Sequence, residues 1–259
     1  MRKAIVLAVV LVLVASLFAA GKISITYAPK NINQVAQNPG NEWLIPEEDI
    51  IEEPRPLFPE TLTVLDAKET TPVNIRKSPD QNAASLGVAY GSLMHVEVLE
   101  ELENGFTKVS TWDYRSMEPI EGYVASKYVK SVKPEGKYQV LVSLKEQKTH
   151  IYKDGILYKT FVNSTGAGDA YTPKGIYLIG DRGGSFFSGK YQQGAYNWVR
   201  FNHNYLFHSI PFDANKKLIP EEAAKLGEKA SHGCIRHSIE DAQWFYENIT
   251  RGTLVVIQD

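Results

Sequence analysis

Ser231-His232-Gly233-Cys234-Ile235-Arg236 is the stretch that says most about the fold and chemistry of this sequence. Cys234 is the only cysteine among 259 residues, so no internal disulfide can form. The thiolate is the nucleophilic form of cysteine, and a nearby imidazolium or a cluster of backbone amides lowers the thiol pKa enough to populate it. Three of the six histidines, His208, His232 and His237, lie near Cys234 in the sequence. We therefore expect a reactive thiol, against the alternative of a small buried apolar residue.

The same stretch, together with Phe207-His208-Ser209, closely resembles the active-site signature of the L,D-transpeptidases, whose catalytic domain is of the YkuD type. The resemblance implies that Cys234 attacks a peptidoglycan stem peptide and that His208 is its base. It also implies that the main-chain carbonyl of Ser209 orients this base, so no aspartate is required. Ser231, His232 and Gly233 would form the active-site loop, whose backbone around the Gly-Cys pair stabilises the oxyanion.

Two residues of the signature allow two interpretations each. The guanidinium of Arg236 could bind a carboxylate of the stem peptide through two parallel hydrogen bonds, or could pair with an acid of the protein itself. The imidazole of His232 could shape the oxyanion pocket, or could only hold the loop in its turn. Both alternatives stay open for each residue at this point.

A zinc site is the rival from another chemical class, because His208, His232, Cys234 and His237 could supply four ligands. Structural zinc sites usually contain a pair of cysteines two to four residues apart, and catalytic sites take ligands from rigid elements. The sequence has one cysteine, so we expect neither a metal nor another cofactor.

The connection between His208 and Cys234 departs from the family pattern, because its 25 residues exceed the usual spacing. Pro220 suits the first position of a helix, acidic residues at 221 and 222 favour its N-terminal end, and Gly227 can close it in a left-handed conformation. We expect a short helix over residues 220–226. The insert is then a solvated connector or, alternatively, a lid over the substrate.

Charge and the N-terminus indicate where the protein acts. The net charge is −2, from 28 basic and 30 acidic residues, and the basic residues are scattered, so no nucleic-acid partner is expected. Arg2 and Lys3 precede an uncharged run over residues 4–20, which predicts a signal peptide or an uncleaved signal anchor over residues 1–20. With either fate, the rest of the chain is extracytoplasmic, in the cell wall or periplasm or on the outer face of the membrane.

Two further segments precede the catalytic part. Residues 21–60 lack a helical or strand period and are rich in proline and acidic residues, which indicates a linker. Residues 61–132 alternate short apolar runs with turn residues, which predicts a small β-barrel. The fragments 73–76, 104–109 and 122–126 resemble the bacterial SH3-like domain. That resemblance implies wall binding through Trp112, Tyr123 and Tyr128, unless these aromatic residues only fill the core.

The segment 137–259 fits the rest of the YkuD resemblance. Strand patterns over 138–144, 150–152 and 156–158 are followed by loops at 164–166 and 172–175 that recur in the family. Asp154-Gly155 predicts a tight hairpin. Ser238 and Asp241 have the spacing of a helix N-terminal cap, and a helix ending at Gly252 and a buried strand over 253–257 should follow.

The fold class expected is therefore mainly β: an SH3-like barrel over 61–132, followed by a β-rich YkuD catalytic domain with short helices over 137–259. The function implied by the resemblance is an exported L,D-transpeptidase that releases D-alanine from a tetrapeptide stem and transfers the acyl group to an amine, so that its partners are stem peptides and the cell wall. The alternatives are a peptidoglycan hydrolase of the same fold and a wall-binding protein without catalysis. The sequence leaves the third stem residue and the acceptor amine open.

Overall fold

The computed structural model describes residues 57–259. The expected signal segment and residues 21–56 of the expected linker lie outside the described residues. The described part is mainly β, with two short α-helices and one 3-10 turn, which confirms the expected fold class. Among residues 57–259, no helix has both the length and the apolar character needed to cross a membrane.

The N-terminal module, residues 62–132, consists of seven strands and the 3-10 turn η1 (Ser126–Tyr128). Five strands form an antiparallel sheet in the order β3-β2-β6-β5-β4, and β1 pairs with β7. Alternate residues of β5 are buried, as expected for a sheet with one face on a core. A small β module is thus present, and its relation to the SH3-like domain stays a prediction. The strands are β1 (Leu62–Leu65), β2 (Pro72–Arg76), β3 (Ser85–Tyr90), β4 (Glu97–Glu101), β5 (Phe106–Trp112), β6 (Pro119–Ala125) and β7 (Val129–Val132).

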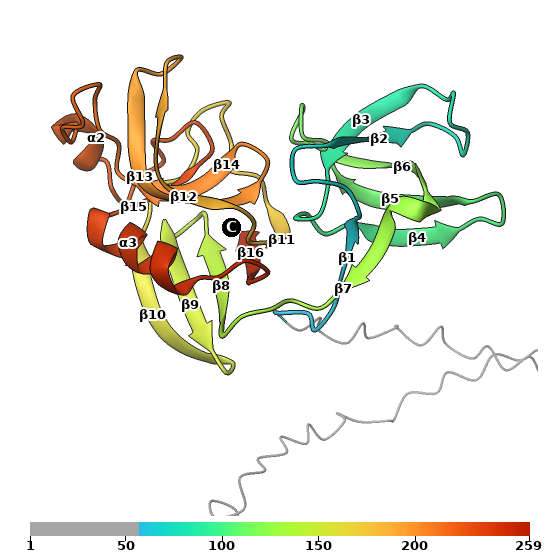
Figure 1. Ribbon diagram of the computed structural model, residues 1–259, viewed down its shortest axis with the longest axis horizontal. Coiled ribbons are helices and arrows are strands. Elements are labelled where there is room, and N and C mark those ends of the chain that lie inside the picture. Colours follow the sequence, from blue (N-terminus) through green and yellow to red (C-terminus); the bar gives the residue numbers. More distant parts are fainter. Residues whose placement is uncertain (1–56) are drawn as a thin grey trace, which may run out of the picture. The chain divides into compact units, whose positions relative to one another are not determined.

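The C-terminal part contains two sheets that enclose its main core (Figure 1). One sheet has the strand order β10-β9-β8-β16-β11, and the other has the order β12-β13-β14-β15. The strands are β8 (Tyr138–Ser143), β9 (Lys148–Lys153), β10 (Ile156–Val162), β11 (Gly175–Leu178), β12 (Arg182–Ser188), β13 (Gln193–Asn202), β14 (Tyr205–Ser209), β15 (Ile235–His237) and β16 (Leu254–Gln258).

The pairing of β14 with β15 positions the predicted catalytic residues. These two strands are parallel, and His208 is directly opposite Arg236 in the register. Parallel neighbours cannot be joined by a tight hairpin, because the chain must return to the end from which it started. Residues 210–234 make this return, and they contain the helix α2 (Pro220–Ala223). The long insert is therefore a crossover connection.

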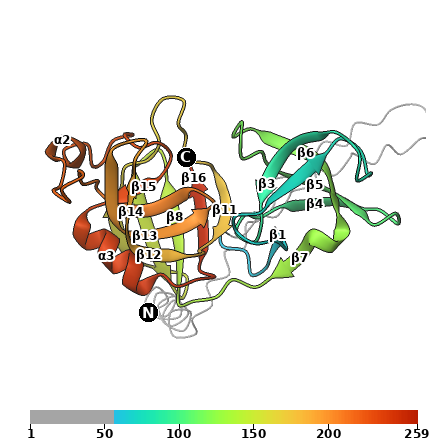
Figure 2. The ribbon, with the colours of Figure 1, turned by 45° about the horizontal axis from the view of Figure 1, so that its top comes forward.

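The helix α3 (Ile239–Asn248) packs against β13, β14 and β15 (Figure 2). Its N-terminus is capped as predicted, because the Ser238 hydroxyl accepts a hydrogen bond from the backbone N–H of Asp241. Phe245 stacks on Phe207 of β14 with ring centroids 4.4 Å apart, and Trp244 contacts Phe161 of the other sheet. The helix thus closes the core between the two sheets.

Other expected elements are present, with shifts at their ends. The hairpin at Asp154-Gly155 is confirmed, and both residues have the positive φ of a type I′ turn. The last strand runs over 254–258 instead of 253–257, and α3 ends at residue 248, before Gly252. The helix expected over 220–226 stops after Ala223, so that expectation was wrong for its second half.

The N-terminal module and the C-terminal part share a small core within the unit that spans residues 54–259. The main-chain carbonyl of Leu93 accepts a hydrogen bond from the N–H of Leu178 at 2.7 Å. Met94 forms an isolated β-bridge with Tyr177. The buried members of this shared core are Leu62, Val64 and Leu93 from the module, and Leu178 and Leu254 from the C-terminal part.

Candidate active site

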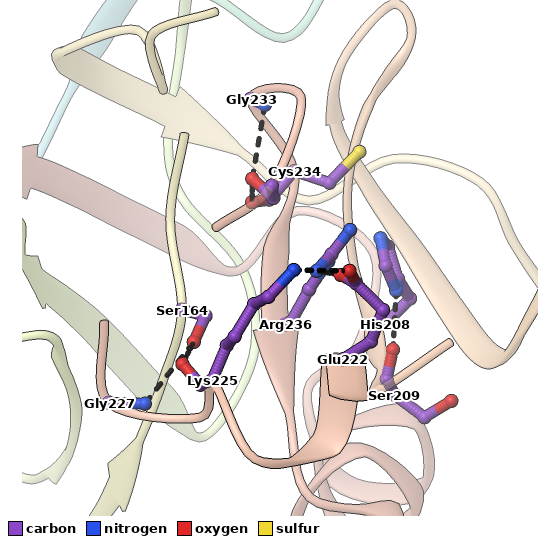
Figure 3. A network of polar contacts seen from close by, with 10 residues as sticks. Ser164, His208, Ser209, Glu222, Lys225, Gly227, Gly233, Cys234 and Arg236 are labelled. Atoms are coloured by element: carbon purple, nitrogen blue, oxygen red, sulfur yellow. Dashed lines mark hydrogen bonds and ion pairs between the residues drawn. The ribbon is translucent and has the colours of Figure 1, made fainter. Parts of the chain in front are cut away.

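Cys234 and His208 line the same cavity, which has a volume of about 520 Å³. Cys234 immediately precedes β15 and is half-buried, whereas His208 lies on β14 and is 6% exposed. In Figure 3, the ring nitrogen of His208 that is remote from Ser209 points to the side on which the Cys234 sulfur lies. The parallel strand pair therefore brings together two residues that are far apart in the sequence.

The imidazole of His208 is held as a neutral base. Its Nδ1 lies 2.6 Å from the carbonyl oxygen of Ser209 (Figure 3). A carbonyl can only accept, so Nδ1 carries the proton and the neutral ring has a free electron pair at Nε2. Burial lowers the pKa of His208 to about 4, although the Ser209 carbonyl opposes this shift, and the positive charge of Arg236 adds to it. At neutral pH, Nε2 can take up a proton.

The thiol of Cys234 does not match the expectation of a lowered pKa. Burial raises its pKa, and this effect outweighs the hydrogen bond from the main chain of Leu206 and the charge of Arg236, which both lower it. The sulfur also lies 3.7 Å from the carbonyl oxygen of Asn204. A neutral thiol beside a neutral imidazole requires that the base remove the proton during attack, so there is no stable thiolate at rest.

Ser231 and Gly233 shape the loop before the thiol. The Ser231 hydroxyl donates to the carbonyl of Cys234 and accepts from the N–H of Gly233. Gly233 has φ +107°, and a Cβ there would lie 2.5 Å from the ring of Tyr205. Only glycine fits this position. The Gly233 N–H donates to Ser231, and the oxyanion role that the resemblance implies for the backbone around Gly233 and Cys234 stays a prediction.

Arg236 pairs with an acid of the protein. Its Nη1 contacts Oε2 of Glu222 on α2, and the side chains of the two residues are 5% and 14% exposed. The same carboxylate accepts from Nζ of Lys225 through its other oxygen (Figure 3). These two positive groups lower the pKa of Glu222, against the effect of burial, which raises it. Arg236 still borders the cavity, but its Nη1 is committed to Glu222.

The crossover connection is exposed or half-buried over most of its length, and hydrogen bonds fix it to the rest of the C-terminal part. The hydroxyl of Ser164 donates to the carbonyl of Lys225 at 2.7 Å and accepts from the N–H of Gly227. The Gly227 N–H also reaches the carbonyl of Asn163, and Gly227 has φ +101°, the left-handed conformation expected from the sequence. These contacts, with the pair between Glu222 and Arg236, hold the connection in place.

The other two histidines near Cys234, His232 and His237, are placed apart from each other. His237 is fully buried, and its Nε2 lies 2.9 Å from the hydroxyl of Thr149, on the core side of β15. His232 is exposed, lines the cavity and stacks on Tyr191 with ring centroids 4.1 Å apart, and its two expected roles stay predictions. Within residues 57–259, no three His, Cys, Asp or Glu side chains converge in a way that could hold a metal ion.

Several residues that line the cavity were not predicted from the sequence. Tyr114 of the N-terminal module, Lys190, Arg200 and Tyr205 all line it. No motif marks these residues, because they lie on separate strands and loops that come together only in the folded chain. The carboxylate of Glu222 was recognised only as a favourable charge at a helix N-terminus.

Comparison with known proteins adds to this geometry. Residues 137–257 match the YkuD family, described as the L,D-transpeptidase catalytic domain. These residues thus resemble an L,D-transpeptidase catalytic domain and are called the transpeptidase domain. A protein of Bacillus subtilis (strain 168) that is provisionally named L,D-transpeptidase YciB is 49% identical to the chain over 122 residues. The match covers 45% of this chain and 63% of the Bacillus protein.

The chain is also similar to solved structures over part of its length. An L,D-transpeptidase from Stackebrandtia nassauensis is 24% identical, with a TM-score of 0.39, over 49% of this chain and 59% of that one. An L,D-transpeptidase from Mycobacterium smegmatis is 14% identical, with a TM-score of 0.42, over 73% of this chain and 100% of that one. The family assignment of the transpeptidase domain rests on the family match and the Bacillus relative.

Proposed function

We propose that the chain is an exported peptidoglycan L,D-transpeptidase that uses Cys234 as its nucleophile and His208 as its base. The observation that supports this proposal is the hydrogen bond from Nδ1 of His208 to the Ser209 carbonyl, which leaves Nε2 free beside the cavity that the thiol also lines. The substrates are peptidoglycan stem peptides. The reaction needs no cofactor.

The proposed reaction has two acyl transfers. In the first, Nε2 of His208 takes the thiol proton while the Cys234 sulfur attacks the carbonyl of the third stem residue, and the imidazolium then protonates the nitrogen of the departing D-alanine. A thioester is left on Cys234. In the second, the amine of a neighbouring stem attacks the thioester carbonyl and gives its proton to His208, and the thiol is regenerated as the new amide bond forms.

The choice between transfer and hydrolysis depends on which nucleophile reaches the thioester. We expect the purified chain to convert disaccharide tetrapeptides into dimers linked through the third stem residue, with one D-alanine released for each bond. Mass spectrometry of the products decides the question. Cys234→Ala should form no thioester and no dimer, because the chain has no second thiol.

Other products would point to the alternatives. Tripeptide monomers alone, at every concentration of acceptor, would identify the chain as a hydrolase. No turnover and no acylation in the wild type would favour a wall-binding protein without catalysis. A loss of activity on treatment with EDTA would overturn the thiol mechanism.

Export and wall attachment belong to the same proposal. Residues 1–20 have the composition of a signal peptide or signal anchor, which supports an extracytoplasmic location with or without a membrane anchor at residues 4–20. The N-terminal module would then bring the transpeptidase domain to the wall. Recovery of the chain from the cytoplasmic fraction of its own cells would contradict this location.

A further inference from the structure

Tyr114 of the N-terminal module borders the cavity that contains Cys234 and His208. It lies in the loop between β5 and β6, outside the transpeptidase domain. We propose that Tyr114 is a positioning residue of this cavity, so that the N-terminal module completes the active site of the neighbouring domain. The inference rests on the proposed role of Cys234 as the nucleophile.

The loop that carries Tyr114 is firmly attached to its own module. The N–H of Tyr114 donates to the carbonyl of Val88 at 2.8 Å. The adjacent Asp113 is buried, and its carboxylate accepts hydrogen bonds from the N–H of Val88 and from the N–H and hydroxyl of Ser116. A loop held by this many hydrogen bonds presents the Tyr114 ring in one place.

The Tyr114 ring contacts the turn between β13 and β14. His203 in this turn has φ +39°, which is unusual for a residue other than glycine. Its ring stacks on Tyr90 of the module at 3.8 Å and meets the Tyr114 ring edge to face at 5.1 Å. Two aromatic residues of the module thus enclose a turn whose backbone conformation needs support from its surroundings.

The same turn leads directly to the thiol. Asn204 lies beside the Tyr114 phenol, and its carbonyl oxygen contacts the Cys234 sulfur. The next residues form β14, which carries His208, and Tyr114 also packs against Tyr205 of this strand at 5.7 Å. Asn204 is therefore the one residue between Tyr114 and the thiol, and Tyr114 also packs against the strand that carries His208.

Substitution of Tyr114 in the full chain tests this role. Iodoacetamide reports only on Cys234, because there is no other cysteine, and its rate of reaction can be followed against pH by intact mass. We expect Tyr114→Ala to react faster and with a lower apparent thiol pKa, since removal of the ring admits water to a thiol whose pKa is raised by burial. The kcat/KM for dimer formation should fall at least tenfold in the same variant.

Two further variants separate positioning from general loss of structure. Tyr114→Phe keeps the ring and loses the hydroxyl that lies beside Asn204, so its kcat/KM should fall about fivefold, as for the loss of one polar contact, with alkylation little changed. Phe106→Ala is the matched control, because Phe106 is another half-buried aromatic residue of the module that does not line the cavity. It should behave as the wild type in both measurements.

Identical alkylation profiles for Tyr114→Ala and Phe106→Ala would overturn the inference. So would a Tyr114→Phe variant with wild-type kcat/KM if Tyr114→Ala fails to fold. The alkylation measurement does not depend on turnover. A wild type that forms no dimers would thus contradict the proposed function, whereas the rate of Cys234 alkylation would still test the role of Tyr114.

Discussion

At the scale of single residues, the site consists of two neutral groups. Burial disfavours the charged forms of both Cys234 and His208, so the thiol keeps its proton and the imidazole stays unprotonated. A neutral thiol reacts slowly with oxidants, because susceptibility follows thiolate character. In the proposed mechanism, the thiol becomes a strong nucleophile only when His208 removes its proton.

The lowered pKa of His208 predicts the acid limit of activity. A protonated imidazole cannot accept the thiol proton, so kcat/KM should stay level as the pH falls past 6.5, the ordinary histidine value, and should drop tenfold per unit below about pH 4. Dimer formation measured between pH 3.5 and 8 provides the profile. An acid limb centred near pH 6.5 would show that the base is more exposed than His208.

The same shift affects stability, with a definite sign. Between about pH 6.5 and pH 4, the unfolded chain binds a proton at His208 that the folded chain does not, so stability is lost as the pH falls through this range. His237, whose pKa burial lowers to about 3, acts in the same direction. Urea unfolding at pH 7 and pH 5 should show this loss, about 1.4 kcal/mol per pH unit for each histidine.

The sequence identified the two groups of the proposed site but not their protonation. The signature around Cys234 and the histidine at 208 named the two groups, because a short motif can carry residue identities. The pKa of each group depends on burial between strands that are distant in the sequence. For the same reason, the engagement of the Gly233 N–H with Ser231 could not be foreseen.

At the scale of elements, the helix α2 acts through one carboxylate. Glu222 places a negative charge against the buried Arg236, beside the strand that follows the nucleophile. Removal of one partner of a buried ion pair leaves the other charge without compensation, and this is far more costly than the loss of an exposed pair. The crossover connection thus contributes a charge that the catalytic motif requires.

Glu222→Ala should accordingly destabilise the chain by about 2–4 kcal/mol, somewhat below the full value for a buried pair because Glu222 is 14% exposed. Glu221→Ala is the matched control: it removes an exposed carboxylate from the adjacent position of the same helix. Urea unfolding of both variants and the wild type provides the comparison. Equal effects of the two substitutions would show that Arg236 does not depend on Glu222.

The length of α2 shows where sequence patterns stop being informative. The start at Pro220 was predicted correctly from local preferences. Beyond Ala223, the backbone of Lys225 and Gly227 bonds instead to Ser164 and Asn163, residues some 60 positions earlier in the chain. Local propensity is a weak preference that such tertiary contacts override.

At the scale of the whole described chain, the N-terminal module and the transpeptidase domain depend on each other. The shared core contains leucines from both, and Glu69 of the module is buried between Arg251 and the N–H of Asp181. Alternating strand patterns predicted two β-rich segments but could not show which buried leucines meet across the boundary. The boundaries of the two domains themselves stay predictions.

We expect the two parts to unfold together. Separation near residue 135 would expose the leucines of the shared core and leave Glu69 without its partners, at a cost of roughly 1.5–3 kcal/mol for each leucine that becomes exposed. Urea unfolding of the full chain, followed by tryptophan fluorescence and by circular dichroism, should give coincident curves. Two separated transitions would show that the parts are independent.

The parallel pairing of β14 and β15 limits the crossover connection at few positions and leaves its length variable. A connection of this kind must only be long enough to bring the chain back, and doubling the length of a flexible loop costs only about 0.6 kcal/mol. Insertions between Asp213 and Pro220 would therefore leave the register of His208 and Arg236 intact. The connection is thus permissive in length at its exposed residues 214–218 and restrictive at Glu222, whose charge faces Arg236.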